Sequence, residues 1–296
     1  MTKQKLSFLG LGVMGYPMAG HLATAGYDVT VYNRTASKAS QWLEQYKGRS
    51  AATPADAVSG ADMVFACVGN DDDVRDITIG EQGAFANMNP GTVFVDHTTA
   101  SADIARELST LASERGFSFL DAPVSGGQAG AENGILTIMV GGDETAFDTA
   151  RPMMSCYAQA VALMGGSGSG QLTKMVNQIC IAGVVQGLSE GVAFAANAGL
   201  DAKLVFEVIS KGAASSWQMI NRAETMIAGQ FEFGFAVDWM RKDLGLCFDE
   251  SDRNGSELPV AQLVDSYYAQ VQDNGGNRWD TSSLVTRLAI SRKQNP

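Results

Sequence analysis

The amino-acid sequence predicts an α/β protein, with a doubly wound parallel sheet in the N-terminal half and an all-helical C-terminal domain. Three observations support this prediction. Short β-type runs alternate with helical stretches in the first half, a glycine-rich stretch (residues 165–170) follows, and no β-type run appears after it. The 296 residues are about twice the common size of one domain, so two domains are expected.

The first half has the pattern of a parallel sheet that is covered by helices on both faces. The strand candidates are Leu6–Leu9, Asp28–Tyr32, Met63–Val68, Thr92–Asp96, Phe117–Asp121, Ile135–Val140 and Ala160–Met164. The helix candidates between them are Met14–Ala25, Ser37–Tyr46 and Ser101–Arg115. We place the domain boundary in the glycine-rich stretch, which is either a flexible linker or an ordered turn, and expect domains over residues 1–165 and 166–296.

Long helical patterns fill the second domain. They cover Gln171–Ala198, Ala202–Ser210, Trp217–Ala228, Phe235–Asp252, Pro259–Asn274 and Ser282–Ser291. In the first of these helices Gly183, Gly187 and Gly191 recur every four residues, and each costs roughly 1 kcal/mol relative to Ala. This stripe indicates close helix packing, within the chain or between the subunits of a homodimer or homotetramer.

Composition and charge exclude several classes of function. The net charge of −11 repels phosphate backbones and anionic lipids, so we expect neither a nucleic acid nor a membrane as partner. The longest apolar stretch (residues 179–198) contains too many polar residues for a membrane span. Four scattered cysteines and two histidines predict no metal site, and the absence of an export signal favours a cytoplasmic protein.

A glycine motif follows the first strand. Gly10, Leu11, Gly12, Val13, Met14 and Gly15 fit G-x-G-x-x-G between a strand and a helix, as in a Rossmann-type dinucleotide-binding domain. The first glycine permits a tight turn, the second allows a pyrophosphate to approach, and the third lets the helix pack on the strand. We therefore predict a dinucleotide site at the start of this helix.

The end of the second strand distinguishes between the two nicotinamide cofactors. A site for NAD usually has Asp or Glu here, whereas this chain has Asn33, Arg34 and Thr35. Asn33 does not repel a 2′-phosphate, Arg34 is able to bind it, and Thr35 adds a hydroxyl donor. The sequence thus favours NADP (NADPH) over NAD.

Four segments in order resemble the β-hydroxyacid dehydrogenase family, which includes 3-hydroxyisobutyrate dehydrogenases, tartronate semialdehyde reductases and glyoxylate/succinic semialdehyde reductases. The segments are Phe8–Ala19, Asp121–Gly127 (DAPVSGG), Gly170–Gln178 (GQLTKMVNQ) and Lys242–Leu244. The resemblance implies an oxidoreductase that interconverts a small 3-hydroxy or 2-hydroxy carboxylic acid with its semialdehyde or keto form.

The resemblance also implies roles for single residues. It implies that Lys174 is the catalytic lysine and that Ser125, Gly126 and Gly127 bind the substrate carboxylate. It places Thr99 beside nicotinamide and substrate, and Phe235 and Asp243 near the substrate. Val68 and Lys242 are expected to contact the cofactor. Two positions depart from the common pattern: Gln178 stands where many members have Asn, and Gly69 where Pro is frequent. The second departure weakens the cofactor contact that is expected at Val68.

The chemistry explains why a lysine is needed. Hydride transfer to a carbonyl builds negative charge on oxygen, and a donor must deliver a proton there. Desolvation should lower the high pKa of Lys174 for this task, and Asn177 and Gln178 lie on the same face of the helix, where they are able to orient substrate or amine. His97 is either polar lining or a second proton carrier. Two alternatives stay open: an imine reductase-like enzyme, although those commonly carry Asp or Tyr in place of Lys174, and a non-catalytic NADP-binding module.

Overall fold

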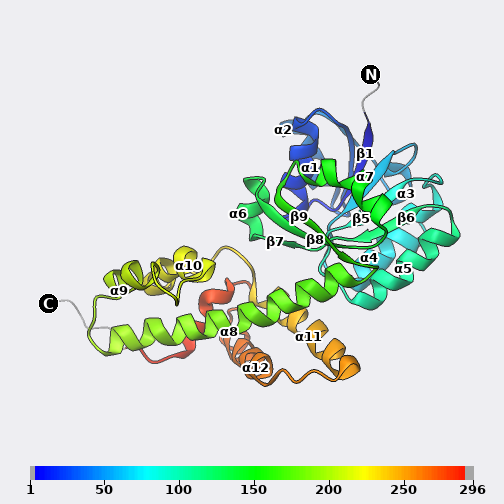
Figure 1. Cartoon of the computed structure of the whole chain (residues 1–296). Helices are drawn as coiled ribbons and strands as arrows, with labels where there is room; N and C mark the ends of the chain where they lie inside the picture. Colours follow the sequence, from blue (N-terminus) through cyan, green and yellow to red (C-terminus); the bar gives the residue numbers. More distant parts are fainter. Residues whose placement is uncertain (1–3, 291–296) are drawn as a thin grey trace. The chain divides into compact units, whose positions relative to one another are not determined.

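The computed structural model describes residues 4–290, and the chain divides into two compact units, residues 1–174 (unit 1) and 175–296 (unit 2) (Figure 1). The division falls inside helix α8 (Ser169–Asn197). The glycine-rich stretch lies before this point and forms an ordered turn, in which the N–H of Gly168 donates to the carboxylate of Asp121. The domain boundary that we place after residue 165 stays a prediction.

Unit 1 contains a nine-stranded sheet. The strands are β1 (Lys5–Leu9), β2 (Asp28–Tyr32), β3 (Arg49–Ser50), β4 (Met63–Ala66), β5 (Val93–Asp96), β6 (Ser118–Asp121), β7 (Val124–Ser125), β8 (Leu136–Gly141) and β9 (Ala158–Gly165). The order β3-β2-β1-β4-β5-β6 is parallel throughout, β8 pairs antiparallel with β6 and β7, and β9 is parallel to β8. The strand order reverses between β1 and β4, where doubly wound sheets bind ligands at the carboxyl ends of their strands.

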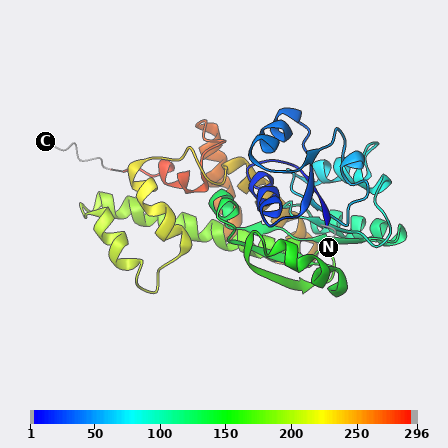
Figure 2. The same cartoon turned by 90° about the horizontal axis from the view of Figure 1, so that it is seen from above.

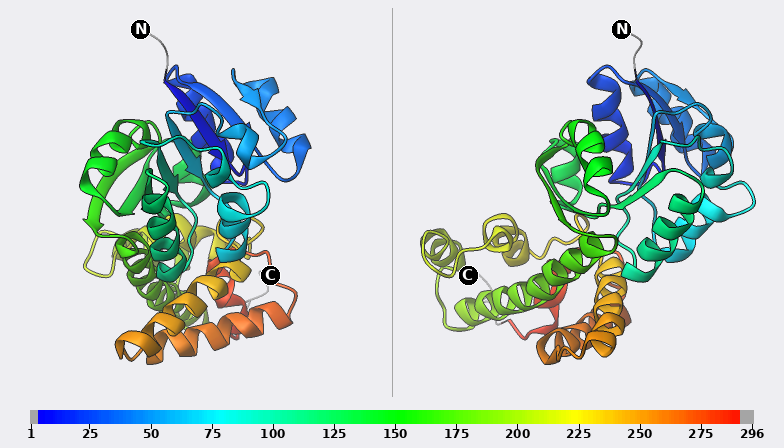
Figure 3. Two further views of the ribbon diagram at one scale, coloured as in Figure 1. Left: turned by 90° about the vertical axis from the view of Figure 1, so that its right-hand side faces the viewer. Right: turned by 45° about the vertical axis from the view of Figure 1, so that its right-hand side comes forward.

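Helices cover both faces of this sheet (Figure 3). They are α1 (Gly15–Thr24), α2 (Ala36–Gln45), α3 (Pro54–Ala57), α4 (Asp71–Ile79), α5 (Ala102–Glu114), α6 (Gly127–Glu132) and α7 (Glu144–Met154), with the 3₁₀ turn η1 (Ala84–Ala86). Strand β5 shows how its two faces are used, because Val93 and Val95 join the apolar cluster of α1, α2 and α7, while Phe94 joins the cluster of α3, α4 and α5. All three β5 side chains are buried, as a parallel strand between two helix layers requires.

Four helices of unit 1, the short α3 and α6 and the longer α4 and α7, have no counterpart among the predicted helices. Helix α4 begins after Asn70, whose side chain accepts from the N–H of Asp73, and α7 begins after Asp143, which caps Ala146 in the same way. The three consecutive aspartates at the start of α4 and the proline inside α7 obscure the helical pattern, although acidic residues stabilise a first helical turn.

Unit 2 is built from helices. Besides the rest of α8 it has α9 (Ala202–Ile209), α10 (Trp217–Ala228), α11 (Val237–Asn254), α12 (Pro259–Asp273) and the 3₁₀ helix η2 (Thr281–Arg287). Figure 2 shows α9 and α10 as neighbours, and α11 packs on α12 around an apolar cluster that includes Met240, Leu244 and Tyr268. The predicted α-helix Ser282–Ser291 is wrong: the chain forms the shorter 3₁₀ helix, and Ser291 lies outside the described residues.

Helix α8 is long and apolar. By length and composition alone it would suffice to cross a membrane, but one such helix is weak evidence, because the core helix of a soluble protein meets the same criterion. Its glycine stripe has few neighbours among the described residues. A Cβ at Gly191 would make an ordinary van der Waals contact with Phe206 at 3.6 Å, and no described atom lies within 4 Å of a Cβ at Gly187. Close packing of this stripe within the chain, one of the two expectations, is therefore not found among the described residues.

Candidate active site

The glycine motif adopts the geometry that a dinucleotide loop needs. Gly10 has φ of +99°, and a side chain there would collide with the carbonyl oxygen of Cys67 at the end of β4. A side chain at Gly15 would collide with the carbonyl oxygen of Gly10, whereas no described atom lies within 4 Å of a Cβ at Gly12. The loop is thus closed toward the protein at its first and third glycines and open at the second, which fits the approach of a pyrophosphate.

Asn33 ties this loop to the end of β2. Its side-chain oxygen accepts from the N–H of Leu11 at 2.8 Å, and its amide nitrogen donates to the carbonyl of Thr35 at 3.0 Å. Asn33 therefore holds the glycine loop in place, a structural task that the sequence interpretation did not assign to it. Arg34 is exposed, and its guanidinium lies 3.0 Å from a carboxylate oxygen of Asp73, the third residue of α4.

The ends of β4 and β5 are linked through Val68 and Thr98. The N–H of Val68 donates to the hydroxyl of Thr98 at 3.0 Å, and the N–H of Thr98 donates to the carboxylate of Asp96. Burial raises the pKa of Asp96 to about 7, opposed by its hydrogen bonds with Thr98. Thr99 follows at the carboxyl edge of the sheet and is partly buried.

His97 lies in the core of unit 1. One ring nitrogen contacts the carbonyl oxygen of Ala122 at 2.7 Å, the other contacts the hydroxyl of Tyr157 at 2.8 Å, and the ring stacks on Phe65. Burial lowers the pKa of His97 to about 4, so the ring is neutral at pH 7. With both nitrogens engaged, His97 fits a structural role better than that of a second proton carrier.

Lys174 lies next to the predicted carboxylate loop. The lysine is buried in the second turn of α8, and its ammonium group donates to the carbonyl oxygen of Val124 at 2.8 Å. Val124 directly precedes Ser125, Gly126 and Gly127, and both glycines have positive φ, at +129° and +61°. Unit 1 therefore brings the predicted proton donor to the start of the predicted substrate loop.

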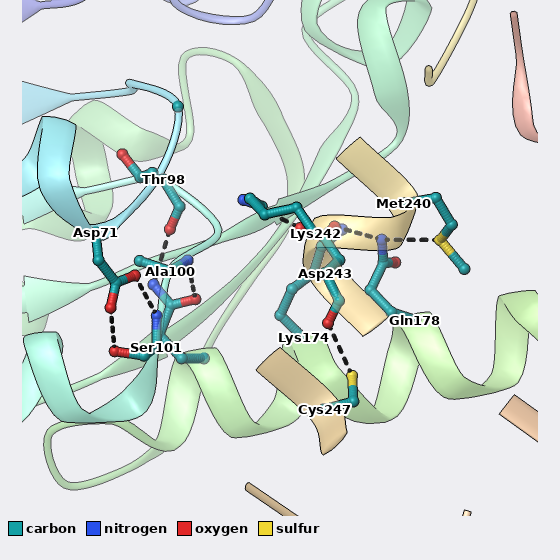
Figure 4. Close-up of polar contacts among 12 residues, drawn as sticks. Asp71, Thr98, Ala100, Ser101, Lys174, Gln178, Met240, Lys242, Asp243 and Cys247 are labelled. Carbon is teal, nitrogen blue, oxygen red and sulfur yellow. Dashed lines mark hydrogen bonds and ion pairs between the residues drawn. The ribbon is translucent and has the colours of Figure 1, made fainter. Parts of the chain in front are cut away.

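Unit 2 gathers a second polar cluster on α8 and α11 (Figure 4). Gln178 and Asp243 are buried, and the amide nitrogen of Gln178 donates to Asp243 at 2.7 Å. Lys242 forms an ion pair with the same carboxylate at 3.1 Å, and Asn177 donates to the side-chain oxygen of Gln178 at 2.8 Å. Four of the predicted site residues in unit 2 are thus connected by direct contacts.

Phe235, the fifth predicted site residue of unit 2, is held by an aspartate that the sequence interpretation missed. The buried carboxylate of Asp280 accepts from the N–H of Phe235 at 3.0 Å, from Arg222 at 3.1 Å and from the hydroxyl of Ser282 at 2.6 Å. A side chain at Gly234 would collide with Asp280. Asp280 thereby fixes the backbone that carries Phe235.

The described residues include no group of three or more His, Cys, Asp or Glu side chains that is arranged to hold a metal ion. Carboxylates in unit 1 are instead bonded to backbone N–H groups, as Asp96 is to Thr98 and Asp121 to Gly168. These bonds belong to the fold around the site.

Comparison with known proteins decides the family. Residues 5–166 match the family model described as the NAD binding domain of 6-phosphogluconate dehydrogenase. Residues 168–288 match the family model described as NAD-binding of NADP-dependent 3-hydroxyisobutyrate dehydrogenase. The chain belongs to the β-hydroxyacid dehydrogenase family. This β-hydroxyacid dehydrogenase is an oxidoreductase that acts on CH–OH groups and has a nicotinamide dinucleotide-binding domain, as the sequence predicts.

Similarity extends over nearly the full length of the dehydrogenase. An uncharacterized oxidoreductase of Shewanella frigidimarina is 64% identical (97% of this chain, 99% of the relative), and the 2-hydroxy-3-oxopropionate reductase of Escherichia coli is 34% identical (97% of each). The structure of Mycobacterium tuberculosis 3-hydroxyisobutyrate dehydrogenase with L-serine has a TM-score of 0.86 at 31% identity (97% of this chain, 99% of that chain). A reductive aminase of Aspergillus terreus is similar at a TM-score of 0.61 and 21% identity (97% and 99%), which shows the fold alone.

Proposed function

We propose that the dehydrogenase interconverts a small 3-hydroxy or short 2-hydroxy carboxylate with its semialdehyde or keto form, using Lys174 as general acid and base. One observation carries the proposal: the buried Lys174 ammonium lies 2.8 Å from the carbonyl of Val124, the residue that leads into Ser125, Gly126 and Gly127. An ammonium donor and a loop able to bind a carboxylate thus adjoin each other in unit 1. These are the two groups that reduction of an aldehyde acid needs.

The bound nicotinamide cofactor supplies or accepts the hydride. During reduction, negative charge develops on the carbonyl oxygen, and Nζ of Lys174 gives this oxygen a proton, so that aldehyde, hydride and proton together make the hydroxyl group. During oxidation the same nitrogen takes the proton back. Ser125 and the backbone N–H groups of Gly126 and Gly127 bind the substrate carboxylate, which sets the distance between the carbonyl and Lys174.

The polar cluster of unit 2 is the second part of the proposal. We assign Asn177 and Gln178 to orienting substrate or amine, Lys242 to the cofactor, and Asp243 and Phe235 to the substrate. Asp243 restrains both Gln178 and Lys242, and it is buried, so these two side chains are held in defined positions before any ligand binds. Preorganisation of this kind reduces the entropy that is lost on binding.

We propose that the enzyme prefers NADP to NAD. Two features support this preference: the end of β2 carries the amide Asn33 instead of a carboxylate, and the guanidinium of the next residue, Arg34, is exposed. Arg34 would bind the 2′-phosphate, with Thr35 as a further donor. Replacing Arg34 with Ala should raise the KM for NADPH at least tenfold while that for NADH changes less than about threefold. Equal changes in both would contradict the preference.

The substrate class is tested with a panel of compounds. Glyoxylate, succinic semialdehyde, tartronate semialdehyde, methylmalonate semialdehyde and, in the oxidative direction, serine are each mixed with NADPH or NADP, and the absorbance of reduced nicotinamide is followed. The proposal expects turnover with at least one carboxylate-bearing aldehyde and none with the matching aldehyde that lacks a carboxylate. Equal turnover of the two would remove the role of the 125–127 loop.

We also propose that two copies of the chain associate through α8. Val176, Val184 and Phe194 are exposed along one side of this helix, and Phe194 is 72% exposed. Gly187, also exposed, leaves room for a close neighbour. Replacing Phe194 with Arg should shift the mass measured by light scattering toward the monomer, whereas Ile135→Arg, at an equally apolar exposed position of unit 1, should leave it unchanged.

A further inference from the structure

A buried carboxylate holds the start of α8, the helix that carries Lys174. Asp121, the last residue of β6, is fully buried, and its two oxygens accept from the N–H of Gly168 at 2.7 Å and from that of Gln171 at 2.9 Å. A Cβ at Gly141 would lie 2.5 Å from one oxygen, and a Cβ at Gly170 would lie 2.9 Å from the other. The surroundings are therefore shaped to admit this carboxylate and nothing larger.

The side chain of Gln171 makes a second connection from the same helical turn. Its oxygen accepts from the N–H of Ala100 at 3.1 Å, and its nitrogen donates to the carbonyl of Thr98 at 2.8 Å. Thr98 and Ala100, which are labelled in Figure 4, flank Thr99, so one amide group binds the peptide groups on both sides of that residue. Gln171 is itself buried, and its hydrogen bonds are shielded from water.

From these contacts we infer that Asp121 and Gln171 are positioning residues, which fix the first turn of α8 against the ends of β5 and β6 and so set the place of the Lys174 ammonium relative to Thr99 and the 125–127 loop. The inference rests on the proposed role of Lys174. Lys174 follows Gln171 by one helical turn, and the residue to which it donates, Val124, follows Asp121 by three residues. A shift of about 1 Å at this turn would move the proton donor enough to cost about 10²-fold in rate.

An aspartate that only stabilises a helix by capping it does not have to be buried as Asp121 is. Unit 1 contains an exposed cap of this kind for comparison. Asp143 is exposed and caps α7 by accepting from the N–H of Ala146 at 2.9 Å. Burial of Asp121 has a cost instead, because desolvation raises the pKa of this carboxyl to about 6, although its hydrogen bonds from the N–H groups of Gly168 and Gln171 lower the pKa. A cap that served stability alone would do so with less cost near the surface, as Asp143 does.

The test compares Asp121→Asn with Asp143→Asn in the full-length enzyme. Asparagine keeps the shape of the side chain but turns one acceptor into a donor that faces an N–H group of α8. We expect Asp121→Asn to lower kcat about 10- to 100-fold with the NADPH dissociation constant changed less than threefold. Asp143→Asn keeps a side-chain oxygen that is able to cap α7, and it should leave kcat within twofold. Similar losses of kcat in both variants would reduce Asp121 to a stabilising residue.

A double variant shows whether Asp121 acts through Lys174. If it does, Asp121→Asn added to Lys174→Ala should cause no further fall in kcat, because the group being positioned is already gone. A second independent loss of tenfold or more would overturn the inference. If Lys174→Ala alone retains turnover, the proposed role of Lys174 is refuted. If Lys174→Ala is inactive but Asp121→Asn has a normal kcat, only the positioning role of Asp121 is refuted.

Gln171→Glu provides a variant that is independent of the aspartate. It keeps the acceptor for the N–H of Ala100 and places an oxygen opposite the carbonyl oxygen of Thr98, so that one of two contacts is lost. We expect a fall in kcat of at least tenfold, again absent when Lys174 is Ala. An unchanged kcat in folded Gln171→Glu would exclude this residue from the positioning pair. If Asp121→Asn fails to fold, the Gln171 comparison decides the inference.

Discussion

Arg34 and Asp73 form an ion pair of 3.0 Å that joins the end of β2 to the first turn of α4. The other oxygen of Asp73 accepts from the N–H of Gly69 at 3.2 Å, so the carboxylate is fixed from both sides. The end of β2 itself has no carboxylate, but α4 brings the carboxylate of Asp73 next to Arg34. A 2′-phosphate has to compete with Asp73 for the guanidinium.

Replacing Asp73 with Asn should therefore strengthen the preference for NADP. We expect the ratio of kcat/KM for NADPH to that for NADH to rise about three- to fivefold, because the exposed pair is worth at most about 1 kcal/mol. Asp72→Asn, on the same helix and exposed, changes the net charge equally and serves as control. If both variants shift the ratio alike, the effect is one of overall charge and the specific competition is refuted.

Two glycines of the dinucleotide loop, Gly12 and Gly15, should respond differently to an added methyl group. Gly12→Ala enters open space and should raise the KM for cofactor at least tenfold while the melting temperature stays the same. Gly15→Ala meets the backbone of Gly10 and should cost about 1–3 kcal/mol of folding free energy, measured by urea unfolding. A normal cofactor KM in Gly12→Ala would show that no ligand approaches there.

Two neighbouring buried groups, Asp96 at the end of β5 and His97 directly after it, should give opposite pH dependences of stability. Burial in the folded state raises the pKa of Asp96 to about 7, whereas the unfolded chain releases this proton near pH 4. The folded state therefore holds one proton more between these pH values, and its stability falls as the pH rises from about 4 to 7. His97 has its pKa lowered to about 4 and removes stability as pH falls from about 6.5 to 4. Asp121 and Asp71, which face Asp96, contribute to its raised pKa.

Urea unfolding of Asp96→Asn and of the unchanged enzyme between pH 5 and 8 isolates the carboxyl. The stability of the unchanged enzyme relative to the variant should fall with pH, by at most about 1.4 kcal/mol per pH unit. A difference that is constant over this range would contradict the burial of a titrating carboxyl at this position.

Asp280 is expected to be the most sensitive acidic residue of unit 2 to substitution. Asp280→Ala leaves Arg222 and the N–H of Phe235 without their acceptor, and breaking a buried ion pair costs about 3–5 kcal/mol. Asp238→Ala on α11 is a control, because its carboxylate is bonded to the more exposed Gln272 and Asn277. If both variants lose the same free energy of unfolding in urea, Asp280 contributes no more to stability than Asp238 does.

Much of the fold could be predicted from local pattern. The segments that form β1, β2, β4, β5 and β6 are short β-type runs, and the helices α1, α2 and α5 between them show a helical pattern. Such patterns are set by neighbours in the sequence. The short helices α3 and α6 and the two-residue strands β3 and β7 were missed, because tertiary contacts stabilise segments too short to show a period.

The residues of the candidate site also fall into those that a local pattern predicts and those that depend on tertiary contacts. Glycine spacing and the lysine motif are local patterns. The structure leaves open space at Gly12 and brings the Lys174 ammonium to the carbonyl of Val124, and the roles of these residues stay predictions. The sequence does not reveal the roles of three aspartates, because each contacts groups that are distant along the chain. Asp73 contacts Arg34, 39 positions away, and Asp280 contacts Arg222, 58 positions away. The third is Asp121. The motif residue Asp121 was named only as part of a segment. Its contact with α8 depends on how β6 and the glycine turn pack.

The proton donor is tested most directly by single-turnover hydride transfer in Lys174→Ala at saturating NADPH, with cofactor binding measured by titration on the same sample. The account predicts that the rate constant falls about 10²- to 10⁴-fold while NADPH binds within twofold of normal. A rate constant within tenfold of the unchanged enzyme would contradict it.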